Sequence, residues 1–427
     1  MASTVLLAAN VRCHGLVVAS AARRAPLGGL KPLRRLVKAN VAAPLPAVEE
    51  APVVAPEPRF EGGQRLANPP PFSLQDIRDA IPKHCFEKDV FRSFAYLALD
   101  VGVVCALAYG AYHLDNPLVW PLYWLAQGTM FWALFVVGHD CGHQSFSSNK
   151  ALNDLVGNIT HASILVPYHG WRISHRKHHA NHGHVENDES WYPVTKSVYD
   201  GLDFLTKLGR LVLPGPLFAY PFYLLRRSPG KKGSHYDPEC DLFTDAEGPL
   251  VETTNKFLCL QLGLLAGLAL TLGPGMIFKL YAVPYWIFVA WLDVVTYLHH
   301  HGPSDEKEQV PWYRGEEWNY MRGGLSTIDR DYGIFNKVHH DIGTHVVHHL
   351  FPQIPHYNLC EATEAVKPVL GDYYREPEPS PGIFPTHLLA PLFRSFDRDH
   401  FVADEGNIVF YQRDPKLRDP SILFNKE

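Results

Sequence analysis

Long apolar runs separated by polar segments dominate the hydropathy pattern from about residue 94 onward. Two runs of about 20 residues lie at 94–114 and 118–137, with an Asp-Asn-Pro break between them. Two further runs lie at 257–277 and 284–298, joined by only a few residues. A helix of ~20 apolar residues is long enough to cross the hydrocarbon core of a bilayer. The pattern therefore predicts four membrane-spanning helices.

Shorter segments between these runs predict helices that do not cross the membrane. Ser73 is a favourable N-cap for a short amphipathic helix that ends near Pro82. The mixed segment 152–167 is too short and polar to span, so we expect it to lie in the interface. Prolines interrupt the apolar stretch 211–225, which we expect to lie along the membrane or to be partly buried. The predicted fold is an all-α membrane protein with about four transmembrane helices, interfacial helices and a helical cap.

The N-terminal region differs in composition from the rest. Residues 1–48 contain seven Lys or Arg and no Asp or Glu, which is typical of an organellar transit peptide; a disordered basic tail is the alternative. Residues 49–71 are rich in Pro and Ala and read as a disordered linker. We expect the membrane domain to occupy 72–414 and a C-terminal tail to occupy 415–427.

Charge and cysteine content exclude some classes of function. The formal net charge of −5 provides no basic footprint for nucleic acid. The seven cysteines contain no CxxC pair, so they indicate neither a disulfide framework nor a zinc ribbon. The 24 histidines, in contrast, are numerous and clustered.

Eight of these histidines form three groups with helical spacing. The segment HDCGH has two at i and i+4, and HRKHH and HVVHH each have three at i, i+3 and i+4. Residues three and four apart share one face of a helix. A single HxxxH is more often a surface pair, but three groups together indicate a metal site. The expected ligands are His139, His143, His175, His178, His179, His345, His348 and His349.

Other candidates surround these eight. His300 ends the fourth apolar run, where an ionisable residue suggests function, and His299 and His301 compete with it. Carboxylates that orient ligating imidazoles are also expected, since such partners fix the ring tautomer. The carboxylate candidates are Asp140, Asp188 and Asp341. For His182, His184, His339 and His340 we expect a structural or solvent role rather than direct ligation.

The number of ligands restricts the metal chemistry. Imidazole suits zinc, copper, iron or nickel. A zinc site uses three or four protein ligands, whereas eight histidines fit two ions with about four ligands each. An even number of spans would place all three groups on the same side. Two redox-active ions beside a membrane suggest activation of dioxygen and attack on a hydrocarbon chain.

The three histidine groups resemble the histidine boxes of membrane-bound acyl-lipid desaturases. Residues 170–191 and 330–357 are similar to those of plastid (chloroplast) omega-3 fatty acid desaturases. The resemblance implies two non-haem iron ions held by the eight box histidines and His300. It also implies insertion of a cis double bond into linoleoyl chains of a membrane glycerolipid, giving linolenoyl chains, with O2 and ferredoxin as electron donor. The expected location is a chloroplast membrane, envelope or thylakoid, with the boxes facing the stroma.

Two alternatives remain at this point. The same scaffold would serve an omega-6 (oleate) desaturase or a fatty acid hydroxylase, because regiospecificity depends on where the acyl chain stops. A histidine-rich membrane metal transporter or sensor is the non-enzyme alternative. That alternative predicts ligands inside the apolar runs, whereas nearly all histidines lie just outside them.

Overall fold

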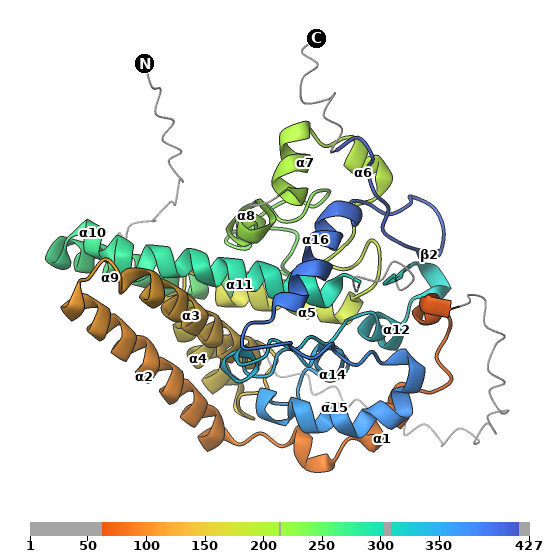
Figure 1. The fold of residues 1–427 in the computed structure, drawn as a ribbon, viewed down its shortest axis with the longest axis horizontal. Coiled ribbons are helices and arrows are strands. Elements are labelled where there is room, and N and C mark those ends of the chain that lie inside the picture. Colours follow the sequence, from red (N-terminus) through yellow and green to blue (C-terminus); the bar gives the residue numbers. More distant parts are fainter. Residues whose placement is uncertain (1–61, 213–214, 303–308, 418–427) are drawn as a thin grey trace, which may run out of the picture. The chain divides into compact units, whose positions relative to one another are not determined.

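The computed structural model describes residues 62–212, 215–302 and 309–417, which are mostly helical (Figure 1). The expected transit peptide, residues 1–48, lies outside the described residues. The last residues assigned to the linker do not behave as one: they form η1 (Gly62–Ala67), in which Leu66 and Ala67 are buried. At the other end, Leu417 in the expected tail is also buried. These three buried apolar residues extend the packed unit beyond the expected limits of the membrane domain, 72–414.

Three helical segments are long and apolar enough to cross a membrane: α2 (Val90–Leu114), α9 (Gly248–Leu272) and the continuous stretch Pro274–His300. Only 11%, 6% and 22% of their most apolar windows are buried. Leu260 and Leu270, for example, are 72% and 89% exposed. A large exposed apolar surface of this kind marks a contact with membrane or partner.

The limits of the third and fourth segments differ from the prediction. The helix α9 ends at Leu272 instead of 277, because Gly273 adopts φ 88° and Pro274 begins the next helix. That next stretch consists of α10 (Pro274–Ile277), the π-helical turn η4 (Phe278–Ala282) and α11 (Val283–His300). It therefore begins ten residues before the predicted start at Pro284, which lies in the first turn of α11.

The second predicted span, α3 (Trp120–Gly142), is the central helix of the bundle. It packs against α2, α4 (Lys150–Ser163) and α11, and most of its side chains are buried (Figure 1). It is not among the three apolar candidates. Its contact with α11 is close because Gly128 faces that helix: a Cβ there would lie 2.4 Å from Ile287 Cβ.

The remaining elements form a cap and a set of short peripheral helices. The predicted N-cap is confirmed, because Ser73 and Asp76 form a capping box at the start of α1 (Leu74–Ala80). The cap helices are α1, α12 (Tyr320–Leu325), α14 (His345–Leu350) and α15 (His356–Leu370), which share one apolar core. The other helices are η2 (Lys83–Phe86), α5 (Tyr168–Asn181), α6 (Lys196–Asp200), α7 (Phe204–Leu211), η3 (Gly215–Phe218), α8 (Tyr220–Arg226), η5 (Gly315–Glu317), α13 (Phe335–Val338), η6 (Gly371–Tyr373), η7 (Thr386–Leu388) and α16 (Leu389–Arg398).

One pair of short strands departs from the all-α prediction. Short strands β1 (Trp312–Tyr313) and β2 (Ile408–Val409) pair antiparallel, with Trp312 opposite Val409. The proline-rich stretch 211–225 is broken into the end of α7, η3 and α8, as the prolines predicted.

The contact between α3 and α11 gives a test of this packing. We expect Gly128→Ala to lower the melting temperature in detergent, since its methyl group would overlap Ile287 and overpacking costs about 1–3 kcal/mol. Gly102→Ala on α2 is the matched control, because no atom lies within 4 Å of its added Cβ. Alanine there should stabilise the helix by roughly 0.5–1 kcal/mol. Equal melting temperatures for the two variants would contradict the close packing.

Candidate metal centre

Four helices bring the histidine groups together. The last turn of α3 carries His139, and His143 follows as its C-cap. The second half of α5 carries the HRKHH group, α14 begins with His345, and α11 ends at His300. The helices α3 and α11 run side by side (Figure 1). At their ends, the rings of His139 and His300 lie 4.9 and 5.1 Å from those of His175 on α5 and His345 on α14.

The ring nitrogens form a first group of five. His139, His143, His175, His179 and His348 each present one nitrogen within 4.8 Å of the others. The nitrogens His175 Nε2 and His179 Nε2 are 3.1 Å apart. Members of all three sequence groups therefore meet at one point.

The other histidines form a second set centred on His300. His300 shares the same 4.8 Å limit with His178 and His182, and separately with His345 and His349. Its Nε2 lies 3.4 Å from His345 Nε2. The structure thus brings all nine predicted residues into these two sets.

The neighbours of His300 point elsewhere. His299 Nδ1 donates to the Ile328 carbonyl oxygen over 2.6 Å, and His301 Nδ1 donates to that of Tyr297 over 3.1 Å. Of these three consecutive histidines, His300 alone belongs to the nitrogen groups found in the described part of the chain.

His182 differs from its expected structural role, because it belongs to the second set. It lies four residues after His178, so helical spacing was the signal that could have found it. The three other weak candidates lie outside these groups in the described ranges. His184 accepts a backbone N–H from Glu186, His340 pairs with Asp100, and His339 packs among aromatic rings.

Asp188 holds two of the second set's rings. Its carboxylate lies 2.7 Å from His178 Nδ1 and 3.2 Å from His182 Nδ1. Burial alone would raise the pKa of Asp188, but attraction and hydrogen bonds from the two imidazoles lower it below the usual range. Because Asp188 contacts Nδ1 of both rings, it fixes their orientation, and the Nε2 atom of each ring faces away from the carboxylate.

The two other expected carboxylates, Asp140 and Asp341, have different partners. Asp140 accepts from His356 Nδ1 over 2.9 Å and lies 3.6 Å from His139 Nδ1. Asp341 instead pairs with Lys337 over 2.7 Å. Asp140 is therefore placed to orient histidine rings, whereas Asp341 is not.

A further carboxylate, Asp329, was not anticipated from the sequence. It accepts the backbone N–H groups of His345 and Val346, over 2.6 and 2.8 Å, and the Tyr374 hydroxyl over 2.8 Å. Burial raises the pKa of Asp329 to about 6. Asp329 thereby fixes the first residues of α14.

The donor set fits a metal ion. His143 Nε2, His178 Nε2 and His348 Nε2 are buried, and none has a hydrogen-bond partner within the described residues. Burial, followed by repulsion from neighbouring imidazoles, holds the pKa of His175 and His179 well below the ordinary value, and the same holds in α14. Neutral imidazoles with free lone pairs are the form that binds metal.

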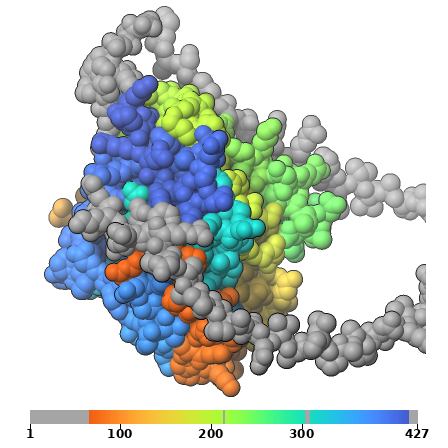
Figure 2. All heavy atoms as spheres, turned by 90° about the vertical axis from the view of Figure 1, so that its right-hand side faces the viewer, coloured from red at the N-terminus to blue at the C-terminus, as the bar shows by residue number. Residues whose placement is uncertain are grey.

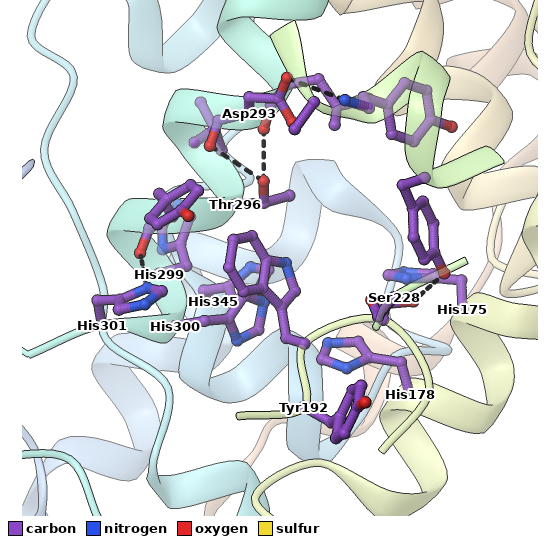
Figure 3. A pocket seen from close by; sticks show the side chains of 18 of the residues that line it. His175, His178, Tyr192, Ser228, Asp293, Thr296, His299, His300, His301 and His345 are labelled. Carbon is purple, nitrogen blue, oxygen red and sulfur yellow. Dashed lines mark hydrogen bonds between the residues drawn. The ribbon is translucent and has the colours of Figure 1, made fainter. Parts of the chain in front are cut away.

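A cavity of about 190 Å³ lies directly beside both sets (Figure 3). Its wall includes His178 and His300 on one side and Phe135 and Leu292 from the bundle on another. Trp132 lines it too. A largely apolar cavity with a few convergent polar groups is the usual form of a small-molecule site.

Comparison with known proteins identifies relatives along most of the chain. A family model described as "Fatty acid desaturase" matches residues 117–378, and one described as a domain of unknown function matches 33–109. A protein of Arabidopsis thaliana named "sn-2 acyl-lipid omega-3 desaturase (ferredoxin), chloroplastic" is 59% identical, covering 88% of this chain and 84% of its own length. A protein of the same name from Helianthus annuus is 62% identical, covering 82% and 78%.

The relatives differ in the compartment that their names give. A protein of Vigna radiata var. radiata named "Omega-3 fatty acid desaturase, endoplasmic reticulum" is 60% identical, over 83% of this chain and 92% of its own length. The family model covers more than half of this chain, and it includes every histidine of the two sets. This chain therefore belongs to the fatty acid desaturase family.

Proposed function

We propose that this protein is an acyl-lipid omega-3 desaturase, an oxidoreductase that inserts a cis double bond into linoleoyl chains esterified in membrane lipids. The observation that carries the proposal is the apolar cavity alongside two convergent sets of histidines. The omega-3 position is supported by the names of relatives at 58–62% identity. The product would be a linolenoyl chain.

The two sets are suited to two non-haem iron ions. One would be held by His139, His143, His175, His179 and His348, and the other by His178, His300, His345 and His349, with His182 adjacent. When bound, such ions supply the one-electron chemistry for dioxygen activation that zinc cannot provide. Asp188 would keep His178 Nε2 aimed at the second ion.

The surrounding residues position and shield the acyl chain. Trp132, Phe135 and Leu292 line the cavity and exclude water from the carbons next to His139 and His300. Removal of two hydrogens while dioxygen becomes water requires two added electrons and two protons. A one-electron iron–sulfur carrier acting twice would supply the two electrons, and the two protons would come from water; ferredoxin appears in the names of relatives.

We also propose that α3 crosses the membrane as a fourth span. Its side chains pack against α2, α4 and α11, so a span at this position need not present an apolar surface to the lipid. Four spans return the histidine sets to the side of the N-terminus. The turn between α2 and α3 carries no Lys or Arg. The positive-inside rule places such a turn on the side of the membrane opposite the histidine sets.

The proposed location is a chloroplast membrane, with the histidine sets facing the stroma. Residues 1–48 would be the transit peptide, and relatives named chloroplastic support this reading. The membrane domain would begin near residue 62, where burial of Leu66 starts, and not at residue 72.

Lipid analysis tests the omega-3 position. Cells expressing the protein and supplied with linoleate should accumulate linolenoyl chains in their membrane lipids. Cells supplied with oleate should gain no dienes, because the apolar cavity would admit the chain but place the wrong carbons beside the histidines. Gas chromatography of fatty acid methyl esters measures both products. Dienes from oleate without trienes from linoleate, or a hydroxylated chain, would refute the proposal.

Substitution of single ligands tests the metal site. We expect His178→Ala and His348→Ala each to lower turnover by more than about 100-fold, beyond the 10–100-fold typical of residues that only orient ligands. Metal content by elemental analysis should fall in parallel, while membrane insertion is retained. His113→Ala, an exposed residue at the far end of α2, is the control. Full metal content in either variant would exclude that residue as a ligand.

Acidification should destabilise the protein. The pKa values of His175, His179, His345, His348 and His349 are depressed in the folded state, so their contribution to stability is complete above the unfolded value of ~6.5. That contribution is lost as pH falls below this value. We expect the melting temperature to drop from pH 7.5 to 5.5 and bound metal to be released, as measured by thermal scans and elemental analysis. A melting temperature that is constant or rises over this range would contradict the prediction.

A further inference from the structure

The apolar helix α2 carries one carboxylate that faces into the protein. Asp100 is the only Asp, Glu, Lys or Arg within 94–114 and is 4% exposed, whereas Leu99 beside it is 63% exposed. The buried residues of α2 are Ser93, Asp100 and Ala111, whose spacing places them on one face of the helix. A buried ionisable side chain in a membrane span is costly and, where it occurs, indicates a function.

Asp100 contacts a histidine from the segment that leads into α14. One of its carboxylate oxygens lies 2.7 Å from His340 Nε2, and both side chains are almost entirely buried. His340 and Asp341 have φ angles of 51° and 53°, a left-handed backbone that residues other than glycine seldom adopt. Such strain persists only where the surrounding structure enforces it, and it is concentrated at functional sites. The contact with Asp100 therefore helps to hold His340 in an unfavourable conformation.

Beyond His340, buried contacts continue to the first histidine set. The ring centroids of His340 and His356 are 4.6 Å apart, and both rings pack against Tyr96, at 5.6 and 4.8 Å. His356 donates from its backbone N–H and from Nδ1 to the same oxygen of Asp140, over 3.2 and 2.9 Å. The second oxygen of Asp140 lies 3.6 Å from His139 Nδ1. These contacts connect α2 to a member of the first set.

The connecting side chains are shielded from solvent. We call them the buried series, and they are Asp100, His340, His356 and Asp140. His356 begins α15, which packs against α1 and lies beside it at the surface (Figure 2). The cavity wall, as the described residues form it, does not include Asp100 or His356. The buried series therefore reaches the histidines without touching a ligand in the cavity.

Packing of α2 alone does not require a polar pair at this position. The helix already packs against α3 through an apolar cluster that includes Ala111 and Trp120. Apolar side chains of similar volume often stabilise a buried position as well as an ion pair does. What the carboxylate adds is direction, because a hydrogen bond to Nε2 fixes how the His340 ring is turned.

We propose that Asp100 is a positioning residue that fixes the orientation of the His139 ring from within α2. It acts through His340 and His356, which hold the Asp140 carboxylate beside that ring. The inference rests on the proposed function, in which His139 binds one of two metal ions. Loss of a group that orients a ligating imidazole typically lowers metal affinity by about 10–100-fold. The effect of Asp100 should be confined to one ion, because His139 belongs only to the first set.

Release of iron to a chelator tests the proposal. Purified holoenzyme in detergent is mixed with a coloured iron(II) chelator, and absorbance follows the loss of the two ions. We expect Asp100→Leu to release one ion about tenfold faster and the other within about twofold of the wild-type rate, since the freed His340 ring no longer supports only the first set. Asp100→Asn keeps an oxygen that accepts from His340 Nε2, so it should restore slow release. Asp100→Ala replaces Asp100→Leu if the larger side chain is not accommodated.

A control variant separates positioning from general stability of α2. Ala111→Gly lies on the same buried face, three turns after Asp100, and glycine weakens a helix. It should lower the melting temperature and leave both rates of iron release unchanged. His356→Phe, in contrast, interrupts the buried series outside α2 and should release one ion faster. Adding Asp100→Leu to it should cause no further change, because both act through Asp140.

Turnover separates this inference from the proposed function. With linoleoyl lipid and reduced ferredoxin, Asp100→Leu should lower kcat and leave KM nearly unchanged, because the cavity wall is not altered. Faster release of both ions to the same extent, or of neither, would overturn the positioning role even in an enzyme that turns over. Selective release from a protein that does not desaturate linoleoyl chains would refute the proposed function alone.

Discussion

The burial of many neutral imidazoles at one place is the constraint on which the rest of this structure depends. Buried polar nitrogens without partners are costly, and here several converge from separate segments. The arrangement is stable only when the surrounding protein holds each ring rigidly or when an ion accepts the lone pairs. The bundle supplies this rigidity: α3 and α11 pack closely at Gly128 and deliver His139 and His300 from their ends.

Carboxylates extend this control outward from the rings. Asp188 fixes His178 and His182, Asp140 ties α3 to His356, and Asp329 holds the start of α14. Asp140 joins segments that lie 216 residues apart, whereas Asp188 and Asp329 fix rings or backbone only 6 to 17 residues away. The cavity is formed by the same elements, so its walls and the nitrogen sets keep a constant relation.

Most of the candidate site could be predicted from the spacing of histidines along the sequence. The eight box histidines follow helical periodicity, and His300 could be chosen because it ends an apolar run. His182 has the same spacing from His178, although the sequence predicts a structural or solvent role for it. Asp329 could not be found, because it contacts His345 only through the tertiary fold. Span limits failed at Gly273 and Pro284 for a similar reason: hydropathy does not reveal the chain reversal at Gly273 or the π-helical turn before Pro284.

The order of the ligands along the chain affects how the protein is made. His139 is synthesised early and His349 late, yet both belong to the same compact arrangement. Neither nitrogen set is complete until α14 has emerged and docked, so contacts between distant segments must precede metal uptake. The bundle would therefore have to be folded before the proposed metal ions bind. Binding of the proposed metal ions would then be a final step of maturation, because both histidine sets need the assembled chain.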